Sequence, residues 1–467
     1  MPLLSSKLPN YSGEYGVGVV DIEVPIEKRI VANAVFQDTG KPAFELETLL
    51  FSLYYPAAKG DEKPRKHHKW VANIPQHGEG YARVANIDHL PGVTRFFTWA
   101  LWSLVGSTTI PADVDAPLHG STSAGGPQAQ QKFPVIILSH GTVSNRTSYT
   151  AWCGELASRG YLVAAVEHRD GSGPGTEVLR EDGTKRDIFF VNRSMLQPEP
   201  ETDDEFKAMQ LAFRQAEVEE TVRILKLINA GAGDEICQKN LRKEGKELAG
   251  FEGRLNEERF VVAGHSYGAT LALQALKGCP SEERPFVAGI ALDPGKSSGP
   301  LNDDIAVPLL VLHSQSWSSK FSIFMGRPHF EVVQDLVRKV LRKEKDKPGQ
   351  PAWFLTSKGT THPSVTDAPL IEPFLLAWTT WSSIDAREGV LQYVMVCNEF
   401  MHFLQDGRRE GVLAEDETHA GYDEDIRSEE RKAKMCRSIS KYWQIHISPP
   451  RADAGATVQH VESVGST

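Results

Sequence analysis

The chain has 467 residues, of which 40% are hydrophobic and 24% are charged, and its formal net charge is −10. This composition is typical of a globular protein with a large core, and the acidity argues against nucleic acid as the main partner. Five cysteines without a C-x-x-C pair, at positions 153, 237, 279, 397 and 436, disfavour a disulfide framework and a structural zinc site.

Residues 1–14 are expected to be a flexible N-terminus. The opening MPLLSSKLPNYSGEYG lacks the basic start and apolar core of a secretory signal, and position 2 is not the glycine that N-myristoylation requires. Together with the scattered cysteines, this indicates a reduced, cytoplasmic protein. The next apolar stretches, YGVGVVDIEVPI and LETLLFSLYYPA, predict antiparallel strands that extend the edge of the main sheet.

Short apolar runs alternate with helical patterns through the middle of the chain. The predicted strands are FPVIILSHG (133–141), YLVAAVEHRD (161–170), RFVVAG (259–264), FVAGIALD (286–293), VPLLVLHS (307–314) and AWFLTS (352–357). Helices are predicted over 144–160 and from about 204 to 229. Because strands of a parallel sheet covered on both faces are apolar throughout, this order predicts an α/β fold with helices on both faces of a mostly parallel sheet.

The predicted domain organisation is a single domain over residues 15–412. Polar insertions are expected near 113–131 and 230–256, where the composition is typical of mobile loops. Residues 413–467 are expected to form a charged, partly disordered C-terminal tail. No internal repeat is visible in the sequence.

The segment RFVVAGHSYGAT, residues 259–270, contains a G-x-S-x-G pattern. The pattern alone is weak, because glycine and serine are common in turns. Here it follows a predicted strand and opens a predicted helix, which is the context of a nucleophile elbow. The glycines permit a sharp turn, and the helix N-terminus stabilises negative charge. Ser266 is therefore predicted to be a nucleophile.

A serine nucleophile needs a base, and the base needs an acid that orients it. In an α/β-hydrolase the chain order is serine, acid, histidine, each beyond the end of a strand. Asp293 ends the next predicted strand and His362 follows AWFLTS, so they are the predicted acid and base. The competing base is His313, which lies in an earlier loop. The competing acids are Asp303 and Asp304, which lie in a polar segment away from a strand end.

The oxyanion hole of such an enzyme needs backbone N–H groups near the nucleophile. Tyr267, directly after the serine, is predicted to supply one of them. The segment LSHGTVSN is predicted to supply the other, because Gly141 lets the backbone approach closely and Thr142 carries the N–H group. The side chain of His140 is predicted to be structural and to pack under this loop.

Several segments together resemble one known family. They are SHGTVSNRTSYTAWCGELASRGYLVAAVEHRDGS, VVAGHSYGAT, GIALDP and KGTTHPS, and the similarity extends over residues 10 to about 405. The family is that of the platelet-activating factor acetylhydrolases of the plasma and intracellular type II kind. The resemblance implies an α/β-hydrolase fold and a reaction that needs no metal or other cofactor.

Carried over position by position, the resemblance places the catalytic roles on residues already singled out. It implies Ser266 as nucleophile, Asp293 as acid, His362 as base, and the amides of Thr142 and Tyr267 as the oxyanion hole. Thr142 stands where the family usually has a bulkier apolar residue, and Tyr267 stands where phenylalanine is usual. Since a backbone N–H does not depend on its side chain, these departures concern the shape of the acyl pocket.

The activity implied by the resemblance is the release of short or oxidised sn-2 acyl groups from phospholipids. This is a calcium-independent serine hydrolase of the 1-alkyl-2-acetylglycerophosphocholine esterase type. Two alternatives stay open: a general carboxylesterase or lipase acting on neutral esters, and a hydrolase-fold binding protein without activity.

Two apolar stretches are candidates for contact with the membrane or lipid particle that holds a lipid substrate. RFFTWALWSLVG (95–106) and PLIEPFLLAWTTW (369–381) are shorter than the about 20 apolar residues that span a bilayer. Each stretch is expected either to pack against the core or to contact a membrane or lipid particle at its surface. No transmembrane segment is expected, and attraction to lipid would be apolar because the chain is acidic.

Overall fold

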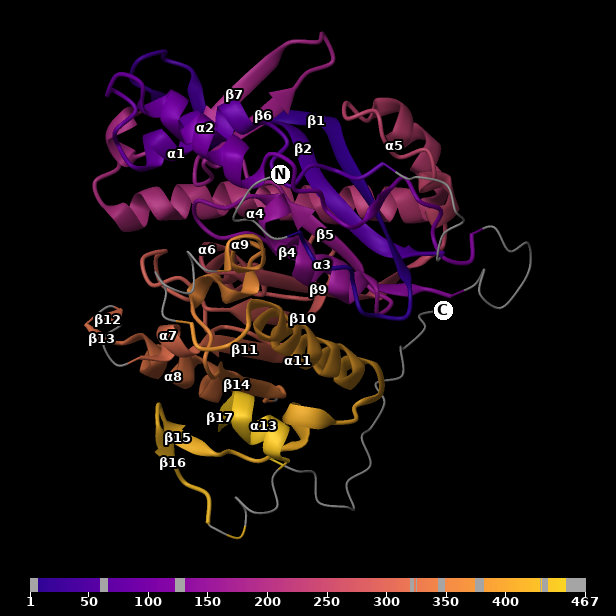
Figure 1. Ribbon diagram of the computed structural model, residues 1–467, viewed down its shortest axis with the longest axis vertical. Helices are drawn as coiled ribbons and strands as arrows, with labels where there is room; N and C mark the ends of the chain where they lie inside the picture. Colours follow the sequence, from indigo (N-terminus) through magenta and orange to yellow (C-terminus); the bar gives the residue numbers. More distant parts are fainter. Residues whose placement is uncertain are drawn as a thin grey trace, which may run out of the picture.

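The computed structural model describes residues 7–58, 66–121, 131–319, 323–324, 326–342, 349–373, 382–428, 430 and 436–450. Eleven strands within these residues form one sheet, in the order β17-β14-β11-β10-β9-β4-β5-β2-β1-β3, with β8 paired to β1. The strands are β1 (Gly16–Phe36), β2 (Pro42–Ala57), β3 (Asp113–Val114), β4 (Phe133–Ser139), β5 (Leu162–Val166), β8 (Leu196–Gln197), β9 (Leu255–His265), β10 (Phe286–Leu292), β11 (Leu309–Ser314), β14 (Ala352–Ser357) and β17 (Trp443–Ile447). Figure 1 shows the sheet extending from β1 and β2 at the top to β17 at the bottom.

The centre of the sheet is parallel, as the sequence predicts. β5, β4, β9, β10, β11 and β14 pair in parallel registers. Nearly every side chain of these strands is buried, apart from the first residues of β9, because helices cover both faces of the sheet. At one edge, β1 and β2 form an antiparallel pair and β2 joins β5, which confirms the expected N-terminal extension.

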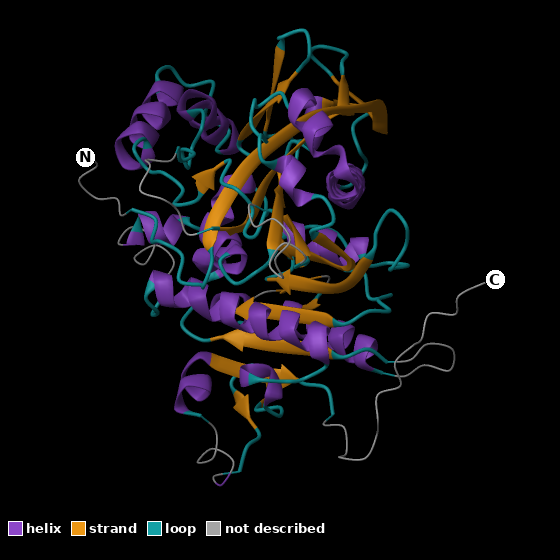
Figure 2. Ribbon diagram, turned by 90° about the vertical axis from the view of Figure 1, so that its right-hand side faces the viewer, coloured by secondary structure: helices purple, strands orange, loops and turns teal. Residues whose placement is uncertain are grey.

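Helices cover the sheet in two layers, and each layer has its own hydrophobic cluster. The longer helices are α1 (Ile74–Val84), α2 (Val93–Val105), α3 (Thr150–Ala157), α4 (Asp203–Leu227), α6 (Tyr267–Ala275), α8 (His329–Leu341) and α11 (Ala386–Asp406). The helices α4, α6 and α8 contribute to the cluster on one face, and α3 and α11 contribute to the cluster on the other. Figure 2 shows the strands stacked along the long axis with helices packed against them.

At the opposite edge of the sheet, the fold continues past residue 412, where the sequence predicts that the domain ends. β17 lies beyond that boundary and pairs antiparallel with β14, so the fold extends into the expected tail. All five residues of this strand, WQIHI, are buried. A strand this short between charged segments has too little periodicity to be recognised from sequence. Residues 429, 431–435 and 451–467 of the expected tail lie outside the described residues.

Two other segments expected to be mobile are packed. In the N-terminal segment, the N–H and hydroxyl of Ser12 donate to the carboxylate of Glu155 on α3. In the insertion 230–256, the side chain of Asn240 is buried and bonds the backbone of β1 on both its amide atoms. These contacts join segments far apart in the chain, which a local composition cannot predict. Residues 1–6 and 122–130 lie outside the described residues.

Candidate active site

Ser266 lies in a sharp turn between β9 and α6, with φ 56° and ψ −119°. A positive φ is costly for a residue other than glycine and recurs at functional sites. A Cβ on Gly264 would lie 2.0 Å from the carbonyl oxygen of Gly268, and a Cβ on Gly268 would lie 2.0 Å from that of Ser139. The two glycines of the pattern are therefore required by close backbone packing around the serine.

Ser266, His362 and Asp293 form one chain of hydrogen bonds. Nε2 of His362 lies 3.0 Å from Oγ of Ser266, and Nδ1 of His362 lies 2.9 Å from Oδ2 of Asp293. The side chain of Asp293 is 3% exposed, whereas that of His362 is 29% exposed. The carboxylate is thus shielded from water, and the imidazole is accessible. The structure brings together the three residues predicted from the sequence as nucleophile, base and acid.

The carboxylate of Asp293 is oriented by the end of β11. The N–H and the hydroxyl of Ser314 each donate to it, at 2.6 Å. The backbone N–H of Asp293 donates to the carbonyl of Leu312 at 2.8 Å. These bonds point one carboxylate oxygen at His362. The sequence does not single out Ser314, because a serine at a strand end is too common to be a signal.

The imidazole of His362 packs against two other rings. The indole of Trp317 stacks on it with ring centres 3.8 Å apart and an interplanar angle of 10°, and the ring of His265 lies 4.5 Å away. Trp317 belongs to the short helix α7 (Gln315–Ser318), and its Nε1–H donates to the carbonyl of Pro294 at 2.8 Å. Burial holds the pKa of His265 well below its ordinary value, so this neighbouring ring stays neutral. The sequence does not single out Trp317 either, because SQSWSS carries no recognisable pattern.

The competing base and acids take no part in the hydrogen-bond chain. His313 is fully buried, and its Nδ1 lies 3.1 Å from the hydroxyl of Ser318. Asp303 and Asp304 are exposed in the connection between β10 and β11, and Asp303 forms an ion pair with Lys339 at 3.0 Å. The geometry therefore favours the predicted pair over these alternatives.

The loop after β4 lies directly beside the serine. A Cβ on Gly141 would come within 3.1 Å of Cβ of Ser266, so a larger residue would crowd the nucleophile. Thr142 follows at an exposed turn, and Val143 bends the chain back with φ 57°. No hydrogen bond among the described residues uses the N–H of Thr142 or of Tyr267 as donor. Both amides are therefore open to another acceptor.

A buried ion pair connects the segments that carry these two amides. Arg214 of α4 donates from Nε to Asp170 at 2.7 Å and from Nη1 to the carbonyl of His140 at 2.7 Å. The same guanidinium lies 4.4 Å from the ring centre of Tyr267. Arg214 therefore holds the loop after β4 and the residue after the serine in a fixed relation. His140 is buried under the loop, as predicted.

Three residues of this site are the one group of potential metal ligands among the described residues. Donor atoms of His265, Asp293 and His362 lie within 4.8 Å of one another. Both nitrogens of His362 already bond Asp293 and Ser266, and Nδ1 of His265 lies 2.8 Å from the hydroxyl of Tyr149. These bonds engage both ring nitrogens of His362 and one ring nitrogen of His265.

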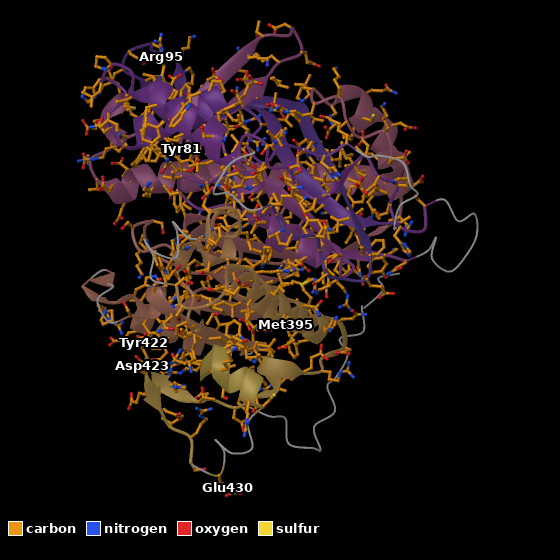
Figure 3. All side chains as sticks on the ribbon, in the orientation of Figure 1. Tyr81, Arg95, Met395, Tyr422, Asp423 and Glu430 are labelled. Atoms are coloured by element: carbon orange, nitrogen blue, oxygen red, sulfur yellow. The ribbon has the colours of Figure 1, made fainter. Side chains whose placement is uncertain are left out.

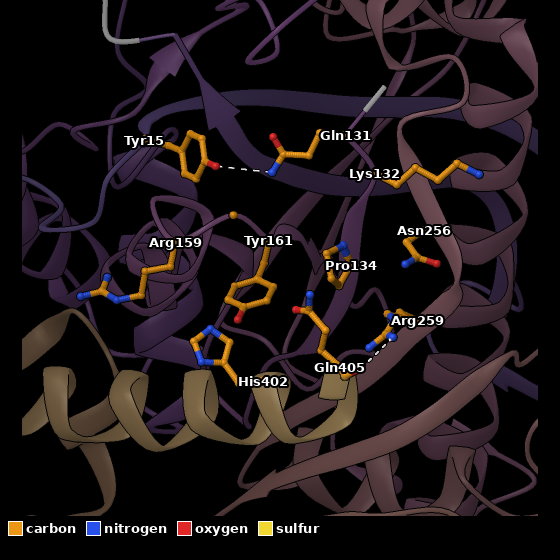
Figure 4. Close-up of a pocket in the computed structure, with 11 residues that line it drawn as sticks. Tyr15, Gln131, Lys132, Pro134, Arg159, Tyr161, Asn256, Arg259, His402 and Gln405 are labelled. Atoms are coloured by element: carbon orange, nitrogen blue, oxygen red, sulfur yellow. Dashed lines mark hydrogen bonds between the residues drawn. The ribbon is translucent and has the colours of Figure 1, made fainter. Parts of the chain in front are cut away.

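A separate cavity of about 280 Å³ is lined by residues at the starts of strands β4, β5 and β9 (Figure 4). Lys132, Tyr161 and Arg259 line it, together with His402 near the end of α11. It is thus at the amino ends of the parallel strands, whereas ligands of open α/β sheets bind at the carboxyl ends. None of the predicted site residues reaches this cavity.

Helix α2 exposes an aromatic face to solvent. Phe96, Trp99 and Trp102 are 61%, 63% and 67% exposed, whereas Val105 at the end of the helix is buried. Figure 3 labels Arg95 on this helix, at the top of the view and far from α13 (Arg437–Tyr442) and β17 at the bottom. Large aromatic side chains on a soluble surface commonly mark a contact with a partner or a lipid surface.

The second predicted apolar stretch is described only in part. Leu370 and Ile371, in α9 (Ala368–Ile371), are buried, and residues 374–381 lie outside the described residues. In the part of the chain that the structure describes, no helix combines the length and the apolarity needed to cross a membrane.

Comparison with known proteins relates this geometry to a family. The family model of platelet-activating factor acetylhydrolase, isoform II, matches residues 3–426. The platelet-activating factor acetylhydrolase of Canis lupus familiaris is 27% identical over 365 residues, which cover 78% of this chain and 68% of that protein. A putative phospholipase A2 of Schizosaccharomyces pombe is 28% identical over 274 residues, covering 56% of this chain and 57% of that protein.

A solved structure has the same fold. The ferulic acid esterase of Streptomyces cinnamoneus aligns with a TM-score of 0.52 and 18% identity, over 88% of this chain and 97% of that chain. The parallel sheet with helices on both faces is thus an α/β-hydrolase fold, as predicted. Because the family model spans most of the sequence, the chain belongs to the platelet-activating factor acetylhydrolase isoform II family.

Proposed function

We propose that this chain is a serine esterase that removes short or oxidised sn-2 acyl groups, such as acetyl, from phospholipids without calcium. The observation that carries the proposal is the hydrogen-bond chain from Ser266 through His362 to Asp293 at the carboxyl ends of the parallel strands. Membership of the family and the names of the relatives support the substrate class.

The acylation half of the proposed reaction begins with a proton transfer. His362 Nε2 takes the proton of Ser266 as Oγ attacks the sn-2 ester carbonyl, and Asp293 stabilises the imidazolium that forms. The amides of Thr142 and Tyr267 donate to the oxyanion. The carbon–oxygen bond of the ester then breaks, and His362 returns the proton to the oxygen of the departing lyso-phospholipid.

The second half of the reaction restores the serine. A water molecule gives its proton to His362 and attacks the acyl-enzyme, and the same two amides stabilise the second oxyanion. His362 then protonates Ser266 Oγ, and the short carboxylic acid leaves. The neutrality of His265 suits this cycle, because a second positive ring 4.5 Å from His362 would oppose formation of the imidazolium.

The substitution Ser266→Ala tests the proposed nucleophile. We expect turnover of a short-chain phosphatidylcholine to fall by about 10⁴- to 10⁶-fold, because the acyl-enzyme cannot form. Ser281→Ala, in a surface turn, is the matched control and should keep the parent rate. Circular dichroism confirms that both variants fold, and a fluorophosphonate probe should label only the parent and the control. If the Ser266→Ala variant kept most of the parent activity, the proposed function would be wrong.

The choice of substrate separates the proposed function from a general esterase. The parent chain is compared on short-chain phosphatidylcholine and on p-nitrophenyl acetate, a neutral ester. We expect efficient hydrolysis of both. Activity on the neutral ester alone would replace the phospholipid proposal with a carboxylesterase, and activity on neither would indicate a silent binding protein.

Helix α2 is our proposed contact with the lipid surface. Its exposed residues Phe96, Trp99 and Trp102 are large and apolar, and the two tryptophans also carry an indole N–H, which suits the membrane–water interface. The helix is too short to span a bilayer, so the contact would be peripheral. The net charge of −10 leaves apolar burial as the source of affinity.

A further inference from the structure

Lys296 lies in the loop after β10, close to the hydrogen-bond chain of the active site. Its Nζ is 3.7 Å from the ring centre of Trp317, and the same indole stacks on His362. The Nε1–H of Trp317 donates to the carbonyl of Pro294, next to Asp293, so the indole has a fixed orientation. The ammonium group is therefore held one aromatic ring away from the proposed base.

The chemistry of the reaction decides which part of a phospholipid meets this region. His362 must return its proton to the sn-2 oxygen of the leaving group, so the glycerol carbons lie on the His362 side of the serine. The phosphate is attached to the neighbouring glycerol carbon, four bonds from that oxygen. A phosphodiester anion is thus brought to the surroundings of His362, where Trp317 and Lys296 lie, and away from the acyl group.

Among the residues that the structure describes, the charges around Lys296 suit an anion. The nearby carboxylate of Asp293 is engaged with Ser314 and His362. Burial keeps the pKa of His313 well below its ordinary value and lowers that of His329 to about 3, so both neighbouring histidines are neutral. Lys296 itself is half-buried, and loss of solvation lowers its pKa to about 8. An anion bound beside it would offset that loss and favour the charged ammonium.

We propose that Lys296, held against Trp317, binds the phosphate of the phospholipid and selects phosphodiester-bearing esters over neutral esters of the same acyl chain. The inference rests on the proposed function and adds a residue that determines specificity. Lysine suits the role because its ammonium is a compact charge that binds phosphate from several directions.

The test uses two substrates that differ only in the head group. These are dibutyryl phosphatidylcholine below its micelle concentration and 1,2-dibutyrylglycerol. We expect Lys296→Met to lower kcat/KM on phosphatidylcholine by about 10- to 100-fold, mainly because KM rises. This is the range for loss of one hydrogen bond to a charged group. On dibutyrylglycerol kcat/KM should change by less than about twofold, because this substrate carries no anion.

Two further variants complete the design. Lys296→Arg should recover most of the phosphatidylcholine activity, since a cation remains. Lys277→Met, just beyond the end of α6 away from Ser266, is the matched control and should affect neither substrate. An equal loss on both substrates with Lys296→Met, or no loss on either, would overturn the inference. A parent chain that hydrolyses dibutyrylglycerol but not phosphatidylcholine would instead refute the proposed function.

A second test needs no variant. Glycerophosphocholine should inhibit dibutyrylglycerol hydrolysis by the parent chain competitively, because it carries the phosphodiester without an ester bond. Raising the pH from 7 to 9.5 removes the charge of Lys296, because its pKa is about 8, while the neighbouring His313 and His329 stay neutral. The inhibition constant should therefore rise about tenfold or more. An inhibition constant that stays the same at both pH values would overturn the inference.

Discussion

His140 shows how a single buried residue links the loop beside the serine to the stability of the fold. Its Nδ1–H donates to the carbonyl of Gly141 at 2.8 Å, and its Nε2 accepts the N–H of His168 at 3.1 Å. A proton on Nε2 would remove that acceptor and place a charge in a dry site beside Arg214. Burial, reinforced by Arg214, lowers the pKa of His140 to about 4.

Because His140 is neutral in the folded protein, the stability of the fold depends on pH. An unfolded histidine titrates near pH 6.5, so the stabilisation from neutral His140 is complete above that pH and is lost as the pH falls toward 4. A His140→Asn variant should therefore show a shallower decline in unfolding free energy between pH 6 and 5 than the parent, by about 1.4 kcal/mol per pH unit. Urea unfolding at pH 7, 6 and 5 measures both slopes. Parallel slopes would contradict the prediction.

At the scale of the element, α2 is distinguished by large apolar side chains that are exposed to solvent. Replacing Phe96, Trp99 and Trp102 together by serine should weaken binding to phosphatidylcholine vesicles at least about tenfold, because each aromatic side chain contributes about 1.5–3 kcal/mol when fully buried. Hydrolysis of p-nitrophenyl acetate should not change. Vesicle sedimentation measures the partition.

The matched control for α2 is Met395→Ser. Met395 is 50% exposed on α11, and Figure 3 shows it well away from Arg95 of α2. This variant should bind vesicles as the parent does. If the triple variant of α2 also binds as the parent does, another surface provides the lipid contact.

At the scale of the whole molecule, the sheet depends on a strand from far along the chain. β17 pairs with β14 from Ile447 opposite Phe354 to Trp443 opposite Ser357. β14 leads directly into the loop that carries His362. The last strand therefore supports one of the proposed catalytic residues as well as the edge of the core.

A chain that ends at residue 436 tests this dependence. The large side chains of Trp443, Ile445 and Ile447 are buried, and each such burial stabilises by about 1.5–3 kcal/mol. We expect the truncation to lower the free energy of unfolding by on the order of 5 kcal/mol or more, with a parallel loss of esterase activity. Urea unfolding is compared with that of a chain ending at residue 450. Equal stabilities would show that β17 is dispensable.

The elements that the sequence predicted well are those with a strong local signal. The strands of the parallel sheet are continuous apolar runs because helices cover both of their faces, and β4, β9, β10 and β14 begin within a few residues of their predicted positions. Residues 7–14, the 230–256 insertion and β17 make tertiary contacts that the sequence does not predict. Their order comes from buried partners such as Glu155, which lie far away in sequence.

The sequence by itself determined the fold class and the set of Ser266, Asp293 and His362, because a strand-turn-helix serine and the order of strand ends are local patterns. Only the tertiary structure decided that Trp317 stacks on His362 and that Lys296 lies over the same indole. It likewise decided that Arg214 joins the loop after β4 to Tyr267. These contacts unite separate loops and helices at the carboxyl ends of the strands. No short segment contains both partners, so no local pattern encodes them.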